Sequence, residues 1–285
     1  MVNLPCQPYM KRKVITKNTA DFLRYLIDNK KSFFTISDAQ EYMPNYSKAY
    51  INEFLESILE RQLSMRIKKG LYVMLPYDTM KEHFFPNRHL TASALVYNRE
   101  HYIGYYKALQ EHDLTTQPSL VEQVVVNKQV KPSEQKIEGV RFQFIYHNQK
   151  HFFGTKKIWV EYMNQSYAIK CSDLEKTIID CLYRPDYSGG IVEVAKAIYT
   201  AQDKFNYKRL LKYLKKMESQ AVIKRLGFIL ELYDIEAPII NEMLALKTNS
   251  YAVLDPIHPK EGKTQSRWSI QVNIDIETII QAPFS

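Results

Sequence analysis

The clearest pattern along the chain is an apolar stripe between residues 47 and 60. Its members recur at the spacing i, i+3, i+4, i+7 and i+8, and they are Ile51, Phe54, Leu55, Ile58 and Leu59. This spacing gathers apolar side chains on one face of a helix. Ser47 stands just before the stripe, and its hydroxyl can accept a backbone N–H of the first turn. We therefore predict a helix that Ser47 caps.

Two further helices are predicted before this one, and two short strands after it. Residues 19–30 carry apolar positions at the helical period. A second helix is predicted to start at Ser37, which has Gln40 at the capping-box spacing, and to stop at Pro44. The later segments LSMRI and LYVML predict strands, with Lys-Lys-Gly at residues 68–70 between them. Three helices and a hairpin in this order indicate a winged helix-turn-helix.

The rest of the chain alternates first at the strand period and then at the helical period. Alternating β-branched and aromatic residues predict strands at residues 120–126, 140–146, 157–162 and 166–171. Apolar stripes predict helices at residues 107–112, 172–182, 192–201, 207–217, 221–233 and 238–246, before a last strand at 268–274. We therefore predict an α+β protein. Its expected domains are a winged helix-turn-helix at 1–80 and a mixed α/β domain at 81–285, with a C-terminal helical bundle over 191–246.

Composition is consistent with a folded protein in a reducing compartment. Of the 285 residues, 45% are hydrophobic and 25% charged, which is typical of one or two globular domains. No apolar run reaches the roughly 18 residues of a membrane span, and the N-terminus lacks a signal-peptide core. The cysteines Cys6, Cys171 and Cys181 are odd in number and lack metal-binding spacing. We therefore expect a cytoplasmic protein without structural disulfides or membrane contact.

The net charge of +8 favours an anionic partner, and nucleic acid first. In a helix-turn-helix, the early exposed residues of the second helix face base edges in the major groove. Asn52 can pair with adenine there, and Lys48 can reach guanine or a phosphate. Cations of the wing suit phosphate or minor-groove contacts. The predicted DNA-binding residues are Ser47, Lys48, Tyr50, Asn52, Arg66, Lys68 and Lys69.

Three glutamates on the outward face of the same helix oppose this interpretation. Glu53, Glu56 and Glu60 would repel a phosphate backbone, although Glu53 can accept a hydrogen bond from cytosine. The alternative is a winged helix that binds protein and serves as an adaptor.

A second basic patch is predicted between residues 203 and 225. This segment contains eight cations and two acids, Asp203 and Glu218, so its local charge is +6. The cations are Lys204, Lys208, Arg209, Lys212, Lys215, Lys216, Lys224 and Arg225. The candidate site within this patch consists of Lys208, Arg209, Lys212, Lys215 and Lys216 on one helix. The pattern is typical of a solvated helix face, and it also suits an acidic protein or a nucleic acid.

Evidence for catalysis is slight. The sequence has no Walker loop, GxGxxG, HExxH or CxxC motif, and its seven histidines show no ligand spacing. Asp173, Glu175 and Asp180 lie on one segment, where carboxylates can hold a divalent metal. More often, acids at such positions cap a helix and favour its N-terminal dipole. We therefore expect no catalytic residue, metal or cofactor, and we keep a nucleic-acid-processing enzyme, either a nuclease or a nucleotidyltransferase, as an alternative.

Several motifs resemble the AbiEi antitoxins of abortive-infection AbiE systems. YIGYYKALQEHDLTTQ (102–117) and SDLEKTIIDCLYRPDYSGGIVEVAKAI (172–198) are similar to the family's patterns "YIS…AL…HGLT" and "PE(K/R)T(I/L)(I/L)D…P…GG". IKRLGFILELYD (223–234), LDP (254–256) and RWSIQVNID (267–275) resemble its C-terminal part. The resemblance runs from near residue 15 to residue 276.

The sequence departs from these patterns at three places. Gly104 stands where the family often has serine, Asp113 where it often has glycine, and Asp173-Leu174 where proline often precedes the glutamate. These departures leave the subfamily open.

The resemblance implies a non-enzymatic antitoxin of a type IV toxin–antitoxin system, which serves in phage defence. In such a protein the winged helix binds inverted repeats in the double-stranded DNA of its own promoter and represses transcription. The C-terminal domain counteracts a nucleotidyltransferase-like toxin. Only the winged-helix residues named above can be carried over as site residues.

Overall fold

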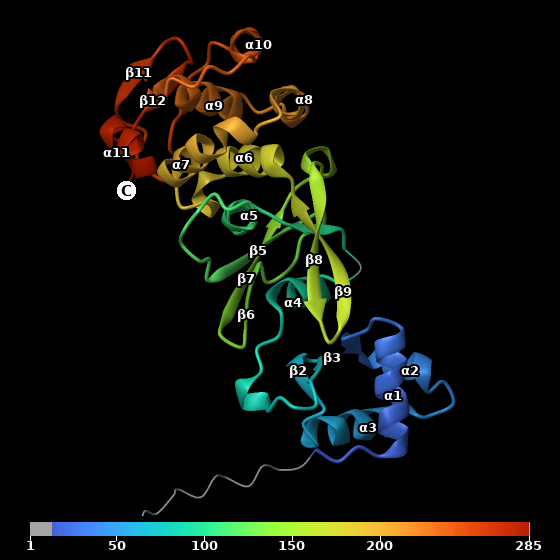
Figure 1. Cartoon of the computed structure of the whole chain (residues 1–285). Helices are drawn as coiled ribbons and strands as arrows, with labels where there is room; N and C mark the ends of the chain where they lie inside the picture. Colours follow the sequence, from blue (N-terminus) through green and yellow to red (C-terminus); the bar gives the residue numbers. More distant parts are fainter. Residues whose placement is uncertain (1–12, 98, 285) are drawn as a thin grey trace, which may run out of the picture. The chain divides into compact units, whose positions relative to one another are not determined.

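The computed structural model describes residues 13–97 and 99–284, so Cys6 lies outside the described residues. The chain forms two compact units (Figure 1). The first unit comprises Met1–Leu95 and Glu161–Tyr167, and the second comprises Val96–Val160 and Ala168–Ser285. Helices and several sheets together agree with the predicted α+β class. None of the helices in the described part of the chain has the length and hydrophobicity needed to span a bilayer.

The first unit contains the three helices and the hairpin predicted from the sequence, together with a short strand at Phe33–Thr35 and a helix at Arg88–Leu95 that the sequence did not indicate. Its helices are α1 (Lys17–Asp28), α2 (Ile36–Tyr42), α3 (Lys48–Glu60) and α4 (Arg88–Leu95). Its strands β1 (Phe33–Thr35), β2 (Ser64–Lys68) and β3 (Leu71–Met74) form an antiparallel sheet in the order β1-β3-β2. The apolar stripe of α3 faces inward, because Ile51, Leu55 and Ile58 are fully or almost fully buried.

Of the two helix caps predicted in this unit, the structure confirms one and contradicts the other. Ser47 accepts the Tyr50 N–H at 3.2 Å, as predicted. The predicted box of Ser37 and Gln40 is wrong, because α2 begins earlier. There, Thr35 accepts the Asp38 N–H at 3.3 Å, and Asp38 accepts the Thr35 N–H at 2.7 Å. The reason is that β1 ends at Thr35, so the helix starts as soon as strand pairing stops.

The second unit is built on a mixed sheet in the order β6-β7-β5-β4-β9-β8. Its strands are β4 (His101–Ile103), β5 (Val121–Val126), β6 (Glu134–Ile137), β7 (Val140–Tyr146), β8 (Thr155–Tyr162) and β9 (Gln165–Ser172). The four strands expected from alternation are present, and β8 lies at an edge. The sequence did not indicate β4, which has three residues, or β6, which is polar and partly exposed. The tip of the β8–β9 hairpin belongs to the first unit.

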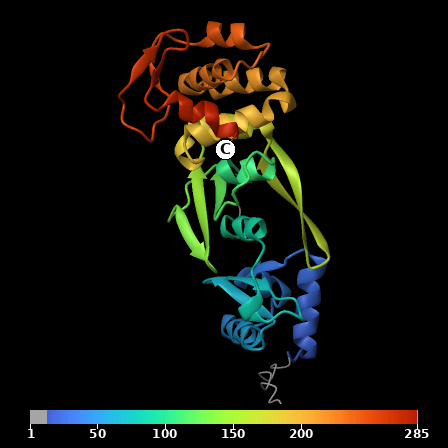
Figure 2. The same cartoon turned by 60° about the vertical axis from the view of Figure 1, so that its left-hand side comes forward.

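Helices form a layer at one end of these strands (Figure 2). They are α5 (Tyr105–Glu111), α6 (Leu174–Tyr183), α7 (Ile191–Ala201), α8 (Tyr207–Met217), α9 (Gln220–Leu232), α10 (Ile240–Leu246) and α11 (Ile276–Gln281). The amphipathic pattern predicted for 221–233 is wrong for most of α9, because residues 222–230 are all buried. A helix buried on every side is expected where several helices pack around it, and α9 contacts α6, α7 and α10.

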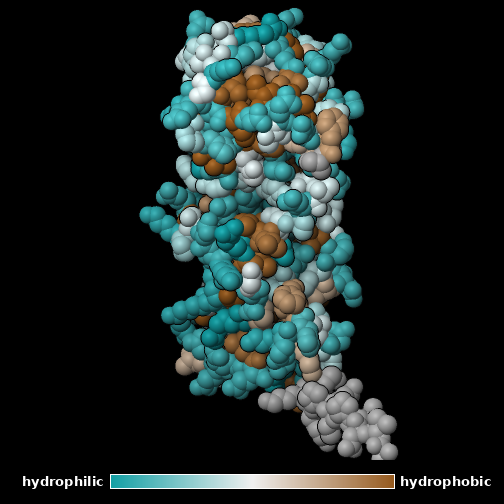
Figure 3. All heavy atoms as spheres, turned by 90° about the vertical axis from the view of Figure 1, so that its left-hand side faces the viewer, coloured by the Kyte–Doolittle hydropathy of each residue, from teal (hydrophilic) through white to brown (hydrophobic). Residues whose placement is uncertain are grey.

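The C-terminal segment covers part of this layer with a small sheet. The strands β10 (Ala252–Val253), β11 (Lys263–Gln265) and β12 (Ile270–Val272) pair in the order β10-β12-β11. The predicted strand 268–274 is shorter in the structure, because Ser269 has a positive φ of 51° and Trp268 turns into the core. Apolar side chains gather on the surface at this end of the chain (Figure 3). Val272, Ile274 and Ile276 line a shallow hollow of about 560 Å³ there.

Candidate functional site

The first turn of α3 presents four of the predicted DNA-binding residues to solvent. Ser47, Lys48, Tyr50 and Asn52 are all exposed, and Ser47 also caps the helix. Tyr50 stacks on Tyr46, with ring centroids 4.6 Å apart. This part of α3 therefore offers a cation, an amide and an aromatic pair on one exposed turn.

The outer acids of α3 are partly neutralised by the hairpin. Glu56 forms an ion pair with Arg66 of β2, and both side chains are about half exposed. Arg66 also lies over the ring of Tyr72, at 5.7 Å from its centroid. Glu53 and Glu60 are exposed. The repulsion expected from three glutamates is therefore reduced, and Arg66 is engaged within the protein.

The two lysines of the hairpin have different environments. Lys68 donates to the carbonyl of Leu95 at 3.3 Å, the last residue of α4. Lys69 is exposed, and within the described part of the chain its ammonium makes no hydrogen bond or ion pair. Gly70 follows with a positive φ of 78°, a conformation that favours glycine and closes the hairpin. Lys69 is thus the cation held most openly at the hairpin tip.

The second predicted patch is real on α8 but smaller than the sequence suggested. Lys208, Lys212 and Lys215 are exposed at helical spacing. Arg209 instead turns toward α6, where its Nε lies 3.3 Å from Glu175. Lys216 lies over the ring of Phe153 at 4.5 Å.

Two cations assigned to this patch are buried, so that assignment is wrong. The ammonium of Lys224 donates to the Ser250 carbonyl and to the hydroxyl of Thr248. The guanidinium of Arg225 donates to the carbonyls of Leu182 and Val253. Both residues belong to the buried helix α9, and each tethers a loop or helix end. Six cations therefore remain of the eight counted.

The candidate metal ligands do not converge. Asp173 caps α6 by accepting the Lys176 N–H at 2.9 Å, and it also accepts from the Tyr213 hydroxyl at 2.8 Å. Glu175 is buried and accepts the Asn206 N–H at 2.8 Å. Among the residues that the structure describes, no group of three or more His, Cys, Asp or Glu side chains could hold a metal ion.

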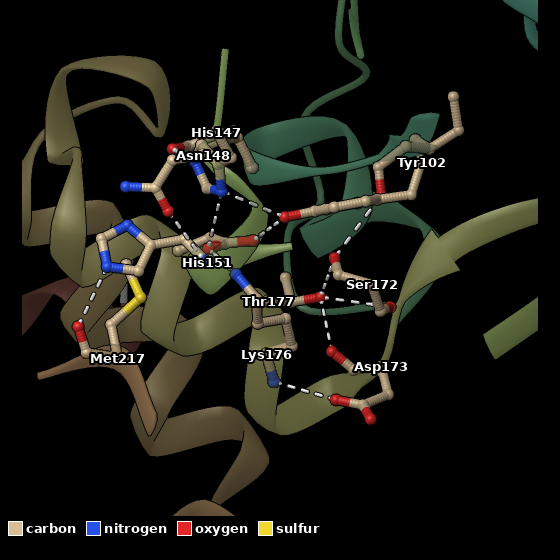
Figure 4. Close-up of polar contacts among 12 residues, drawn as sticks. Tyr102, His147, Asn148, His151, Ser172, Asp173, Lys176, Thr177 and Met217 are labelled. Atoms are coloured by element: carbon tan, nitrogen blue, oxygen red, sulfur yellow. Dashed lines mark hydrogen bonds and ion pairs between the residues drawn. The ribbon is translucent and has the colours of Figure 1, made fainter. Parts of the chain in front are cut away.

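Asp180 instead belongs to a buried polar network that the sequence did not indicate. It forms a fully buried ion pair with Lys176 and accepts a hydrogen bond from Tyr102 at 2.9 Å. His147 lies 3.3 Å from the same Tyr102 hydroxyl, and 2.6 Å from that of Tyr105. Figure 4 shows several members of this network converging from different elements. One signal was present in the sequence, because Lys176 and Asp180 are four residues apart on one helix.

The hydrogen bonds of this network determine the tautomer of His147. Tyr102 has one proton and gives it to Asp180, so the Nδ1–H of His147 donates to Tyr102. Its Nε2 then accepts from Tyr105. Burial lowers the pKa of His147 to about 4, although Asp180 raises it, so the ring is neutral at pH 7. Burial likewise raises the pKa values of both tyrosines well above their usual range.

The network is sealed from solvent. Tyr102, Tyr105, Lys176 and Asp180 have no exposed surface. Tyr105 also has a positive φ of 55°, which is costly for a bulky residue and persists only where surrounding contacts enforce it. The arrangement links β4, α5, the end of β7 and α6 through buried hydrogen bonds and an ion pair.

No protein-family model matches this chain, and no curated protein matches it. Its fold is similar to that of a solved structure, the crystal structure of the RV2827C protein from Mycobacterium tuberculosis. The TM-score is 0.66, and the similarity covers 98% of this chain and 98% of that one. The two sequences are 10% identical, so the similarity concerns the fold alone.

Proposed function

We propose that the first unit is a winged helix-turn-helix that binds double-stranded DNA, and that the chain represses its own promoter as an AbiEi-type antitoxin. The observation that carries this proposal is the exposed first turn of α3, with Lys48, Tyr50 and Asn52 free of the core. A recognition helix needs such a turn, because its N-terminal residues reach base edges in the major groove. In this proposal residues 1–80 bind DNA, and residues 81–285 supply the antitoxin activity.

The charges of the hairpin support different roles in DNA binding for the hairpin and for the first turn of α3. Lys69 is exposed at the hairpin tip and suits a phosphate contact. Arg66 contributes by exchanging Glu56 for a phosphate, since an exposed ion pair holds its partners weakly. Lys68 is held at the end of α4 and contributes chiefly to the local positive potential. The first turn of α3 then determines the preference for a DNA sequence, and the hairpin provides affinity for any duplex.

The proposed antitoxin activity is supported by the resemblance of residues 102–117 and 172–198 to the AbiEi patterns. Several residues of these motifs lie in the buried network, including Tyr102, Lys176 and Asp180. The motifs therefore support a shared core for the second unit. The corresponding expectation is an adjacent gene for a nucleotidyltransferase-like toxin, whose growth inhibition the full chain relieves on co-expression.

Fluorescence anisotropy with a labelled duplex from the chain's own upstream region tests DNA binding. We expect this duplex to bind on the order of a thousandfold more tightly than a scrambled duplex of equal length. Binding to both should weaken as salt rises, because phosphate contacts release counterions. Equal affinity for the two duplexes would contradict a specific repressor and would favour the adaptor alternative.

Two substitutions separate the proposed roles. Asn52→Ala should relax the preference at one base-pair position, while Lys69→Ala should weaken binding to all duplexes alike. Lys128→Ala is the matched control, because Lys128 is exposed in the second unit and has no assigned role. If Lys69→Ala and Lys128→Ala have equal effects, the hairpin has no special part in binding.

A further inference from the structure

One face of the β8–β9 hairpin is exposed and has no role in the core or in the proposed DNA contact. Trp159 of β8 keeps 65% of its surface exposed, and Lys157 and Lys170 are exposed as well. The other tryptophan of the chain, Trp268, is fully buried. Such exposure of a tryptophan is unusual, because its large ring gains most from burial.

The turn of the hairpin places these three side chains together. The two turn residues, 163–164, have positive φ values of 50° and 59°, which is the pattern of a type I′ turn. Counting back from that turn, Lys157 lies opposite Lys170, and Trp159 lies opposite Ala168. Residues opposite one another share a face of the sheet. Trp159 therefore shares its face of the sheet with Lys157 and Lys170.

The position of this face in the sheet argues for a binding role. β8 is an edge strand. Lysines on an edge strand prevent unwanted pairing with other chains. An exposed tryptophan has the opposite effect, because it adds apolar surface to the edge. Protection of the edge therefore explains Lys157 and Lys170 but leaves Trp159 unexplained.

The charges around the face favour an anionic ligand. Within the described part of the chain, Lys157 and Lys170 make no hydrogen bond or ion pair. The start of β8 lies against α8, since a Cβ on Gly154 would come within 2.9 Å of Tyr213. The helix that carries the exposed Lys208, Lys212 and Lys215 thus lies near the start of β8. The acids near α8 are paired, Asp173 and Glu175 with Arg209 and Glu218 with Lys150. Glu161 is an exposed acid on the same face of β8, so the two lysines leave this face with a net positive charge.

We propose that this face binds single-stranded RNA, with a base stacked on Trp159 and phosphates held by Lys157 and Lys170. Cations along the backbone and an aromatic ring for the bases are the two features that single-strand binding requires. A duplex is excluded because its bases already stack on one another. RNA is the occupant because the loops and ends of RNA offer unstacked bases to proteins. The lysines of α8, among them Lys212, continue the path of the backbone.

Intrinsic fluorescence provides a direct test, because only Trp159 of the two tryptophans is exposed. The probes are an oligouridylate of about twelve nucleotides, the matching oligothymidylate, and a duplex of equal length, each added to the full chain. We expect the oligouridylate to quench Trp159 at low salt and to lose this effect as salt rises. Trp268 should contribute a constant background. Absence of quenching, equal quenching by the duplex, or tighter binding of the oligothymidylate would overturn the assignment to single-stranded RNA.

Variants assign the contacts through the anisotropy of labelled oligouridylate. Trp159→Ala should lower affinity about tenfold, and Trp159→Phe should restore most of it, because phenylalanine also stacks. Lys157→Ala and Lys170→Ala should each weaken binding and reduce its salt dependence. Lys263→Ala, at an exposed position of β11, is the matched control. Wild-type affinity in Trp159→Ala would overturn the proposal.

The outcome is independent of DNA binding by the first unit. Trp159→Ala should retain wild-type affinity for the promoter duplex, and its exposed position should leave the melting temperature unchanged. Failure of promoter binding in the wild type would leave the RNA measurement unaffected. Loss of promoter binding in Trp159→Ala would show that the residue serves the duplex and would overturn the separation of the two surfaces.

Discussion

Two ion pairs between a cation and a carboxylate have opposite environments in the two units. Lys176 and Asp180 have no exposed surface, whereas Arg66 and Glu56 are each about half exposed. The buried pair has a hydrogen bond from Tyr102 and lies near two aromatic rings. The exposed pair has water as its alternative partner. The comparison shows that burial, rather than the pairing of charges, determines what each pair contributes.

The same difference separates structural from functional groups. A buried ion pair cannot exchange its partner, because leaving one charge unpaired in the interior costs several kcal/mol. An exposed pair can exchange Glu56 for a phosphate at little cost. The network around Asp180 therefore stabilises the second unit, and the pair on α3 and β2 can exchange its partners, as the proposed DNA binding requires.

Removing one partner of the buried pair should have the largest effect. We expect Asp180→Ala to lower the free energy of unfolding by about 3–5 kcal/mol, because Lys176 and Tyr102 lose their shared acceptor. Glu56→Ala is the matched control, and it should change stability by less than about 1 kcal/mol. Urea denaturation of both variants provides the measurement.

A double substitution distinguishes the loss of the ion pair from the loss of side-chain volume. Lys176→Met with Asp180→Leu removes both charges and keeps comparable volume. We expect it to recover much of the stability lost in Asp180→Ala. Equal destabilisation by Asp180→Ala and Glu56→Ala would refute the dependence on burial.

Acidification should weaken the same network through His147. The pKa of His147 is lowered by burial to about 4, against an ordinary value of 6.5. The unfolded state therefore binds a proton that the folded state does not, between these two pH values. The stability associated with neutral His147 is fully present above pH 6.5 and declines by about 3 kcal/mol as pH falls toward 4.

The measurement is urea denaturation at several pH values between 7 and 4. His147→Gln should flatten the slope in this range, because the variant has no titrating ring at this position. His258→Gln is the control, since His258 is exposed. An unchanged slope in His147→Gln would show that the ring does not couple folding to pH.

A third ion pair is intermediate in burial between the Lys176–Asp180 pair and the Arg66–Glu56 pair. Asp38 pairs with Lys31 at 2.8 Å, with side-chain exposures of 13% and 27%. It also completes the capping box of α2. Asp38→Ala should cost about 1–2 kcal/mol, between the buried and the exposed pair. Chemical denaturation of Asp38→Asn measures the contribution of the charge alone, because asparagine keeps a capping acceptor. If Asp38→Ala loses as much stability as Asp180→Ala, the contribution of an ion pair does not follow its burial.

The elements were largely predictable from the sequence because their signals are local. Ser47 and the stripe from Ile51 to Leu59 predicted α3, and alternation predicted β5, β7, β8 and β9. Local patterns could not predict that Asp180 and His147 meet, because they lie on different elements far apart in the chain.

The buried cations and the short strands escaped prediction for related reasons. Charge counting treats every cation as exposed, yet Lys224 and Arg225 lie on a helix packed on all sides. The strand β4 has three residues, too few for a periodic signal. Among the candidate sites, the exposure of α3's first turn followed from the stripe, whereas the pairing of Arg66 with Glu56 required the register of β2 beside α3.

Releasing the exposed pair should have the smallest effect on stability, and its main effect should be on DNA binding. Glu56→Gln removes the carboxylate that holds Arg66 and should change the free energy of unfolding by less than about 0.5 kcal/mol. The guanidinium then contacts its phosphate without first leaving Glu56, so promoter affinity should rise several-fold, and its salt dependence should steepen because the DNA-facing surface carries one negative charge fewer. Anisotropy titrations across a salt series measure both quantities. Glu242→Gln, an equal change of charge at an exposed position of α10, controls for net charge. An equal gain in both variants would reject the exchange of Glu56 for phosphate, and with it the functional half of the comparison between the two ion pairs.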